Sequence, residues 1–195
     1  MMPDIAVQKA AENALEGRIV GALGRRSIVL VGMMGAGKSS VGRRLAVRLG
    51  IPFVDADSEI EVAAGMTITE IFAKHGEPSF RTGEARVIAR LLDGGPQVLA
   101  TGGGALMDEN TRALIAAKGI SVWLKADVEV LLRRIKRRND RPLAEQIKTL
   151  LPLREPFYAQ ADLIVQSREE PHEAVVEDLI AGLARKLDLP ADGAP

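Results

Sequence analysis

The sequence contains no cysteine and only two histidines, His75 and His172. The absence of cysteine excludes a disulfide framework, thiol chemistry and zinc sites with cysteine ligands. Two histidines are too few for a metal site built from several imidazoles. Aromatic residues make up 3% of the chain, which is too few for the base-stacking platforms that bind single-stranded nucleic acids. Functions that depend on these groups are therefore excluded.

An excess of charge of one sign is also absent, because 26 Lys and Arg residues balance 26 Asp and Glu residues. Nucleic-acid-binding proteins are usually markedly basic, so we expect no nucleic-acid partner. The longest apolar runs, such as 27–31 and 120–124, are far shorter than the roughly 20 residues that cross a membrane. Residues 1–26 carry three carboxylates and no continuous apolar run, unlike a secretory signal. We expect a cytoplasmic monomer without a membrane partner.

Short apolar runs rich in β-branched residues alternate with helical patterns along the 195 residues, a length typical of one domain. This alternation predicts an α/β fold of three layers, with a mostly parallel sheet of about five strands and helices on both faces. The predicted strands are 27–32, 51–57, 97–104, 120–126 and 162–167. The predicted helices are 38–49, 58–64, 69–75, 77–92, 108–118, 127–138 and 171–187.

We predict one domain over residues 25–190, preceded by an amphipathic N-terminal extension (1–24) and followed by a frayed tail (191–195). Two stretches of this domain depart from the alternating pattern. Residues 58–92 contain more helical pieces than one crossover needs, which indicates an inserted helical region. Residues 139–153 begin with turn-forming residues and contain prolines, which favours a mobile excursion over the sheet.

The strongest motif is GMMGAGKS (32–39), which matches G-x-x-x-x-G-K-[ST] between a predicted strand and a predicted helix. Its glycines let backbone N–H groups surround phosphates, and the helix N-terminus adds partial positive charge. Lys38 is predicted to reach the β- and γ-phosphates, and the Ser39 hydroxyl to bind Mg²⁺. Eight matched positions in this context disfavour a chance glycine-rich turn. The predicted ATP-binding residues here are Gly35, Ala36, Gly37, Lys38, Ser39 and Ser40.

An acidic pair, Asp55 and Asp57, ends the second predicted strand. The carboxyl ends of strands face the ligand crevice in an open α/β sheet, and residues two apart in an extended segment share one side. One carboxylate would support the metal through water while the other meets an acceptor hydroxyl. The alternative structural role is a helix cap at Asp57. The guanine-reading Asn-Lys-x-Asp motif is absent, as is an aspartate at the end of the third strand.

Further candidates are a glycine triplet at 102–104 and three arginines. Glycines at a strand end permit close approach of the backbone to a ligand, although a flexible loop is the alternative. Arg81 lies at the start of a predicted helix in the inserted region. The alternative is that its side chain is simply solvated at the surface. Arg141 and Arg154 lie at the two ends of the proline-containing excursion. An arginine that arrives with lid closure can stabilise charge on a transferred phosphoryl group.

Together these segments resemble the shikimate kinase family, within the nucleoside-monophosphate-kinase-like group of P-loop kinases. The matching segments are GMMGAGKSSVGRRLA, DAD, IFAKHGEPSFR, TGGGA, RPL and REPFY, in the family's order between about residues 27 and 187. The resemblance implies a P-loop kinase fold with a substrate-binding insertion (58–92) and a mobile lid (139–153). It also implies ATP-dependent phosphorylation of the 3-hydroxyl of shikimate, giving shikimate 3-phosphate and ADP in the aromatic amino acid precursor pathway.

The resemblance also implies a role for each substrate-site residue. Asp57 would bind the shikimate hydroxyls and orient the attacking one. Arg81 and Arg154 would grip the substrate carboxylate, for which a planar guanidinium is well suited. The loop that approaches shikimate and the γ-phosphate would consist of Gly102, Gly103 and Gly104.

On the nucleotide side, the resemblance implies that Asp55 supports Mg²⁺ through water. Arg134 and Pro171 would hold the adenine. Arg141 would contact ATP from the lid, so that the implied catalytic residues are Lys38, Asp57 and Arg141.

Two alternatives remain open. The span between Arg141 and Arg154 has twelve residues (142–153), fewer than the family commonly has. This feature favours a nucleotide-binding regulatory module with a defective lid. The arginine pair indicates a compact carboxylated acceptor without proving it, so another small-metabolite kinase, such as a gluconate kinase, is the other alternative.

Overall fold

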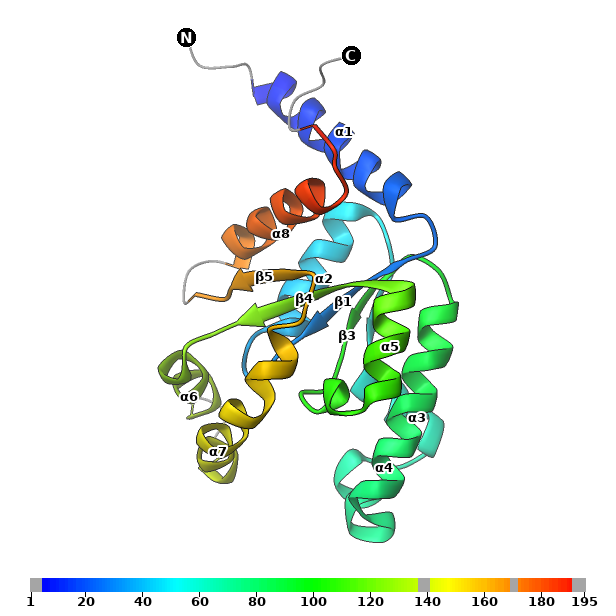
Figure 1. Ribbon diagram of the computed structural model, residues 1–195. Coiled ribbons are helices and arrows are strands. Elements are labelled where there is room, and N and C mark those ends of the chain that lie inside the picture. The colour runs from blue at the N-terminus through cyan, green and yellow to red at the C-terminus, as the bar shows by residue number, and fades with distance from the viewer. Residues whose placement is uncertain (1–4, 137–140, 169–171, 191–195) are drawn as a thin grey trace.

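A computed structural model of the protein describes residues 5–136, 141–168 and 172–190, with backbone alone for 5–13, 136 and 141–145. These residues form a sheet of five parallel strands in the order β2-β3-β1-β4-β5 (Figure 1). The prediction of an α/β fold with a parallel five-stranded sheet is confirmed. The strands are β1 (Ser27–Val31), β2 (Phe53–Asp55), β3 (Val98–Ala100), β4 (Gly119–Lys125) and β5 (Leu163–Gln166).

The central strand β1 explains why its sequence is apolar at nearly every position. All five of its residues are buried, and Ile28 pairs with Val98 on one side and Ile120 on the other. A central parallel strand is covered by helices on both faces, so neither set of alternating side chains meets water. The carboxyl end of β1 therefore lies at the centre of the buried sheet.

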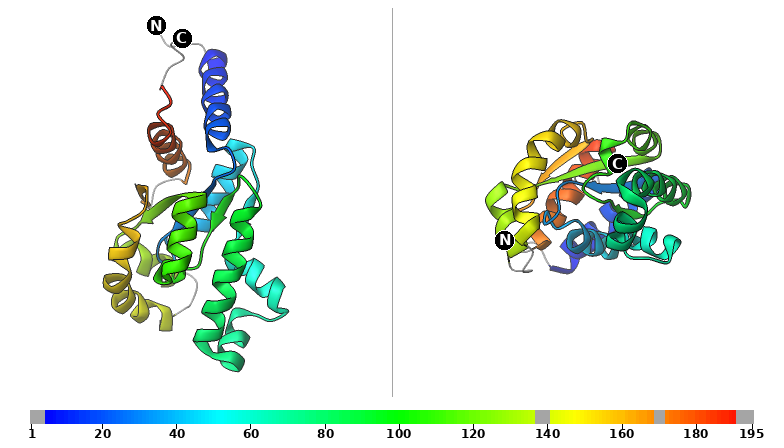
Figure 2. Two further views of the ribbon diagram at one scale, coloured as in Figure 1. Left: turned by 45° about the vertical axis from the view of Figure 1, so that its right-hand side comes forward. Right: turned by 90° about the horizontal axis from the view of Figure 1, so that it is seen from below.

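The helices form layers on both faces of the sheet (Figures 1 and 2). One layer contains α2 (Lys38–Leu49) and α8 (His172–Lys186), and the other contains α4 (Ile68–Asp93) and α5 (Glu109–Lys118). Helix α1 (Ile5–Leu23) projects from one end of the molecule and contacts α2 and α8. Helix α1 lies within the predicted N-terminal extension. Its residues Ile19 and Leu23 belong to the core, and buried Glu16 pairs with Arg48 of α2 at 2.6 Å. The end of this segment therefore packs on the core of the domain.

The inserted region consists of α3 (Ala56–Ala64) and α4. The helices predicted over 69–75 and 77–92 are the two halves of α4, joined at Gly76, which has φ 76° and ψ 170°. This left-handed φ interrupts the helix at a residue that adopts it without steric cost. Pro78 then lies in the first turn of the second half, where its missing N–H is tolerated.

The segment predicted to be a mobile excursion, 139–153, is described from Arg141 onward. From Arg141 onward the chain forms α7 (Arg141–Tyr158), which follows α6 (Val128–Lys136) and contains Pro152 and Pro156. A proline inside a helix costs about 3 kcal/mol. Packing offsets this cost, because Ile147 and Tyr158 of α7 are buried in the core. Among the described residues, no helix is long and apolar enough to cross a membrane.

Candidate active site

Two cavities adjoin at the carboxyl edge of the sheet. The first, of about 430 Å³, is bounded by the start of α3, the start of α8 and the P-loop, which is the segment GMMGAGKS (32–39) between β1 and α2. The second, of about 470 Å³, is bounded by α4, α7 and the glycine triplet. Residues that line both cavities are Met34, Asp57, Gly102 and Gly103. A group bound in one cavity can therefore reach a group bound in the other.

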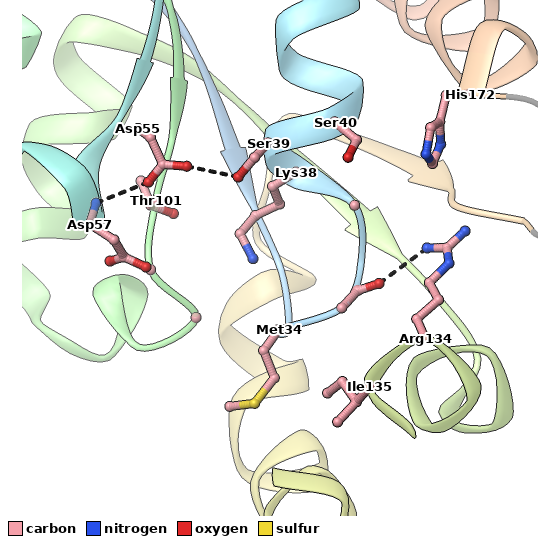
Figure 3. A pocket seen from close by; sticks show the side chains of 14 residues that line it. Met34, Lys38, Ser39, Ser40, Asp55, Asp57, Thr101, Arg134, Ile135 and His172 are labelled. Carbon is pink, nitrogen blue, oxygen red and sulfur yellow. Dashed lines mark hydrogen bonds between the residues drawn. The ribbon is translucent and has the colours of Figure 1, made fainter. Parts of the chain in front are cut away.

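Lys38 projects from the P-loop into the first cavity (Figure 3). Its ammonium donates hydrogen bonds to the carbonyl oxygens of Gly32 at 2.8 Å and Met33 at 3.0 Å. Burial lowers the pKa of Lys38 to about 8, although the carboxylates of Asp57 and Asp55 oppose this shift. Lys38 is thus a partly desolvated cation aimed at the space that phosphates would occupy.

Asp55 connects the P-loop to the start of α3. Its Oδ2 accepts a hydrogen bond from the Ser39 hydroxyl at 2.7 Å, and its Oδ1 accepts one from the backbone N–H of Asp57 at 3.1 Å (Figure 3). Asp55 is therefore the N-cap of α3, and the suggestion that Asp57 caps this helix is wrong. The prediction that both aspartates lie on an extended strand is also wrong, because Asp57 lies in the first turn of α3.

Asp57 nevertheless faces both cavities, as expected of a residue that meets an acceptor. Burial raises the pKa of its carboxyl group, and the neighbouring carboxylate of Asp55 adds to this effect, while Lys38 opposes it. The helical turn brings Asp57 to the boundary between the cavities. A carboxylate at this point can accept a hydrogen bond from a hydroxyl that approaches the phosphates.

The glycine triplet is the surface against which the charged side chains of the second cavity pack. A Cβ on Gly102 would lie 2.8 Å from Asp57 Oδ1 and 2.9 Å from Glu84 Oε1. A Cβ on Gly103 would lie 3.2 Å from Arg154, and one on Gly104 would lie 2.5 Å from Arg81. None of the three glycines has a positive φ, so the backbone conformation does not require glycine here. Glycine is required because the charged side chains approach the backbone too closely for a Cβ.

Arg81 is held by two carboxylates of its own helix. Its guanidinium lies 2.6 Å from Glu84 and 3.1 Å from Glu77. Glu84 is buried, and its second oxygen, Oε1, has no hydrogen-bond partner among the described residues. Burial raises the pKa of Glu84, and the Arg81 charge opposes this shift. Sequence reasoning missed Glu84, although its position three residues after Arg81 on a helix was the available signal.

Tyr158 of α7 holds the backbone of the glycine triplet. Its hydroxyl donates a hydrogen bond to the carbonyl oxygen of Gly103, and its ring lies 5.8 Å from the ring of Trp123. Burial raises the pKa of Tyr158 to about 12, so the hydroxyl keeps its proton and stays a donor. The sequence showed Tyr158 within REPFY but carried no signal of this contact.

At the far end of the first cavity, Arg134 of α6 spans the P-loop and the end of β5. It donates to the carbonyl oxygens of Gly35 and Ala36, both at 3.2 Å, and to the Ser167 hydroxyl at 3.0 Å. These bonds use the edge of the guanidinium. Pro171, which was predicted to hold the adenine together with Arg134, lies outside the described residues, as does the side chain of Arg141.

This geometry defines a class of protein. A P-loop beside a hydroxyl and a carboxylate that can bind a metal ion is typical of a nucleoside triphosphate site. The adjoining second cavity, with two arginines and three carboxylates, provides a site for a small polar acceptor. The chain is a P-loop kinase of a small molecule.

Comparison with known proteins identifies the family. The family model for shikimate kinase matches residues 34–184. Shikimate kinase from Bradyrhizobium diazoefficiens is 62% identical over 178 residues, covering 88% of this chain and 86% of that protein. Shikimate kinase from Rhodopseudomonas palustris is 57% identical over 94% of this chain and 93% of that protein. A solved structure of shikimate kinase from Acinetobacter baumannii in complex with shikimate has a TM-score of 0.76 and 37% identity, covering 87% of this chain and 94% of that chain.

The chain belongs to the shikimate kinase family. The resemblance inferred from the motifs is thereby confirmed, as is the P-loop kinase fold. The relatives at this identity are shikimate kinases, so the family assignment supersedes the gluconate kinase alternative.

Proposed function

We propose that this chain transfers the γ-phosphoryl group of ATP to the 3-hydroxyl of shikimate, giving shikimate 3-phosphate and ADP. The observation that carries the proposal is the junction of the two cavities at Asp57 and the glycine triplet. Lys38 lies on the phosphate side of this junction, and Arg81 and Arg154 lie on the acceptor side. In-line transfer needs both substrates to be held in this way.

On the acceptor side, shikimate carries one carboxylate and three hydroxyls. Arg81 and Arg154 bind the carboxylate, because a guanidinium matches its two oxygens with paired N–H donors. Asp57 accepts a hydrogen bond from the attacking hydroxyl and holds it towards the γ-phosphate. The backbone of Gly102, Gly103 and Gly104 approaches the ring and the γ-phosphate, and the absence of Cβ atoms leaves room for Asp57, Arg154 and Arg81 to lie against it.

On the nucleotide side, the P-loop N–H groups of Gly35, Ala36, Gly37 and Ser40 surround the phosphates. The Lys38 ammonium offsets the charge that develops on the transferred group. Arg134 holds the adenine together with Pro171. Arg141 is proposed to contact the phosphates from the lid, residues 139–153.

The residues near Lys38 fit a magnesium ion. Mg²⁺ prefers oxygen ligands and keeps several waters, so that it takes few ligands from the protein. The Ser39 hydroxyl and the Asp55 carboxylate lie 2.7 Å apart at the P-loop, and the described residues contain no group of three or more His, Cys, Asp or Glu side chains that could hold a metal ion by themselves. Ser39 would bind the ion directly and Asp55 through water. When bound, the ion neutralises charge on the β- and γ-phosphates.

A coupled ADP-release assay with ATP, Mg²⁺ and a panel of hydroxy acids tests the proposal. We expect turnover with shikimate and none above background with gluconate. ATP binding without shikimate-dependent turnover would instead support the regulatory module suggested by the short span 142–153. Cytoplasmic localisation and a monomeric state remain predictions from the sequence.

Replacing Glu84 with glutamine is expected to raise the KM for shikimate several-fold and to leave the KM for ATP unchanged. The amide keeps the volume of the side chain but loses the 2.6 Å ion pair that positions Arg81. The matched control is Glu77→Gln, because Glu77 also pairs with Arg81 but is exposed, where an ion pair contributes little. Steady-state kinetics with each substrate varied provide the measurement. Equal effects of the two variants would contradict a positioning role for Glu84.

The dependence of kcat/KM for ATP on pH is expected to be bell-shaped. Because the pKa of Lys38 is lowered to about 8, its charge and the activity fall as pH rises through about 8. The pKa of Asp57 is raised, so its charge is lost as pH falls through a value above its ordinary range. Profiles between about pH 5 and pH 10 report these groups in the free enzyme. A flat alkaline limb would show that Lys38 keeps its proton, and loss of the acid limb in Asp57→Asn would assign that limb.

A further inference from the structure

Tyr158 contacts both halves of the site, although the proposed function gives it no part in the transfer. It is the last residue of α7, and its side chain is buried. Its hydroxyl donates a hydrogen bond to the carbonyl oxygen of Gly103 in the glycine triplet. The same hydroxyl lies 3.6 Å from the Sδ atom of Met33, the second residue of the P-loop. One buried oxygen therefore joins the loop of the acceptor side to the loop of the phosphate side.

The surroundings keep this hydroxyl protonated and its ring in place. Burial raises the pKa of Tyr158 to about 12, although the positive charges of Arg154 and Arg81 oppose this shift. The ring packs on the ring of Trp123 of β4, with 5.8 Å between the two centroids. Trp123 pairs with Val31, the last residue of β1 before the P-loop. The hydroxyl is thus a hydrogen-bond donor supported by the strand pair from which the P-loop begins.

The two loops approach each other closely beside this hydroxyl. A Cβ on Gly103 would lie 3.6 Å from the carbonyl oxygen of Gly32 and 3.7 Å from the backbone nitrogen of Met34. Both Gly103 and Met34 line the two cavities, so this contact lies at the junction of the cavities. The attacking hydroxyl meets the γ-phosphate at the same junction. A displacement of one loop against the other therefore changes the distance between the reacting atoms.

We propose that Tyr158 is a positioning residue for phosphoryl transfer, whose hydroxyl holds the glycine triplet at a fixed distance from the P-loop. Tyr158 lines neither cavity, so it acts through Gly103 and Met33 rather than by contact with a substrate. Misplacement of bound reactants by about 1 Å can lower a rate about a hundredfold. The inference rests on the proposed function, because it requires transfer between the two cavities.

The test is Tyr158→Phe, which removes the hydroxyl and keeps the ring. The matched control is Thr111→Val, which removes another buried hydroxyl, on α5 and outside both cavities. Single-turnover transfer at saturating ATP and shikimate measures the chemical step, and calorimetry measures the binding of shikimate and of ADP. We expect Tyr158→Phe to lower the transfer rate about tenfold or more, with both dissociation constants within about twofold of wild type. The control should keep the wild-type rate.

Two spectroscopic probes are specific to this place, because Tyr158 is the only tyrosine of the sequence and Trp123 the only tryptophan. The fluorescence of Trp123 reports whether Tyr158→Phe is folded under the assay conditions. Incorporation of fluorotyrosine labels Tyr158 alone and keeps its hydroxyl. We expect the fluorine NMR resonance to shift when shikimate binds and when ADP binds, because the hydroxyl contacts both loops. This measurement decides the matter even if the phenylalanine variant does not fold, since a resonance that neither ligand moves would overturn the inference.

An unchanged transfer rate in folded Tyr158→Phe would overturn the inference alone and leave Tyr158 a structural role. A loss that appears only as weaker binding of shikimate would also overturn it, because Tyr158 would then act on the carboxylate site through Arg154. An equal loss of rate in Thr111→Val would trace the effect to general loosening of the fold and would overturn it as well. Absence of shikimate-dependent turnover in wild type would overturn both the inference and the proposed function.

Discussion

Replacing Lys38 with alanine is expected to lower kcat for shikimate phosphorylation by about a hundredfold or more, as for loss of a key electrostatic group. Lys38 is a cation of the P-loop that lines the first cavity. Its ammonium is partly desolvated, which strengthens its interaction with phosphate charge over that of a solvated lysine. The charge on the transferred group develops mainly in the transition state, so the loss falls on kcat more than on the KM for ATP.

The fold should survive this change. The Lys38 ammonium contacts two backbone carbonyl oxygens, and burial of its charge is unfavourable, so its removal should cost the fold little. Thermal unfolding and circular dichroism provide the check on folding. The matched control is Lys118→Ala on α5, where Lys118 pairs with Asp93 at the surface. A Lys38→Ala enzyme with nearly wild-type turnover would refute the assignment of the P-loop as the phosphate site.

Replacing Arg154 or Arg81 with lysine is expected to raise the KM for shikimate about tenfold or more, because a bidentate pair is lost. Lysine keeps the positive charge, so the effect isolates the geometry of the guanidinium. Arg81 is held in place by Glu84 at 2.6 Å, and Arg154 approaches the position of a Cβ on Gly103 to 3.2 Å. The KM for ATP should change little, since neither residue lines the first cavity.

The methyl ester of shikimate separates carboxylate recognition from general binding. We expect the wild type to bind the ester much more weakly than shikimate, and the lysine variants to discriminate less between the two. The control is Arg90→Lys, because Arg90 forms an exposed pair with Glu59 outside both cavities. Equal binding of shikimate and its ester by wild type would remove the reason for assigning the two arginines to a carboxylate.

The sheet and the P-loop could be predicted from the sequence because their signals are local. A central parallel strand is apolar at successive positions, as Ser27–Val31 is, and its neighbours in the sheet follow the same rule. The P-loop is one continuous segment whose glycines and Lys38 act through the backbone geometry of a single turn. The motifs in order along the chain were enough to indicate the family.

The acidic pair shows a limit of prediction from local sequence. The alternating pattern of a strand predicted that Asp55 and Asp57 lie on one extended segment. In the structure the Asp55 carboxylate caps α3, so the helix begins at Ala56 and Asp57 belongs to its first turn. A side-chain cap and an extended strand compete for the same residues, and the sequence pattern did not decide between them. The two carboxylates face the same cavity for a different reason from the one expected.

The sequence by itself determined the fold class, the phosphate-binding loop and the set of arginines and glycines that could meet a carboxylated acceptor. Only the tertiary structure decided that Glu84 positions Arg81, that Tyr158 holds Gly103 and that His172 lines the nucleotide cavity. Packing also made residues 141–158 a helix despite Pro152 and Pro156. These features depend on how α4, α7 and α8 pack around the carboxyl edge of the sheet. Contacts between residues so distant along the chain arise from the burial of whole helices, which no local pattern of residues encodes.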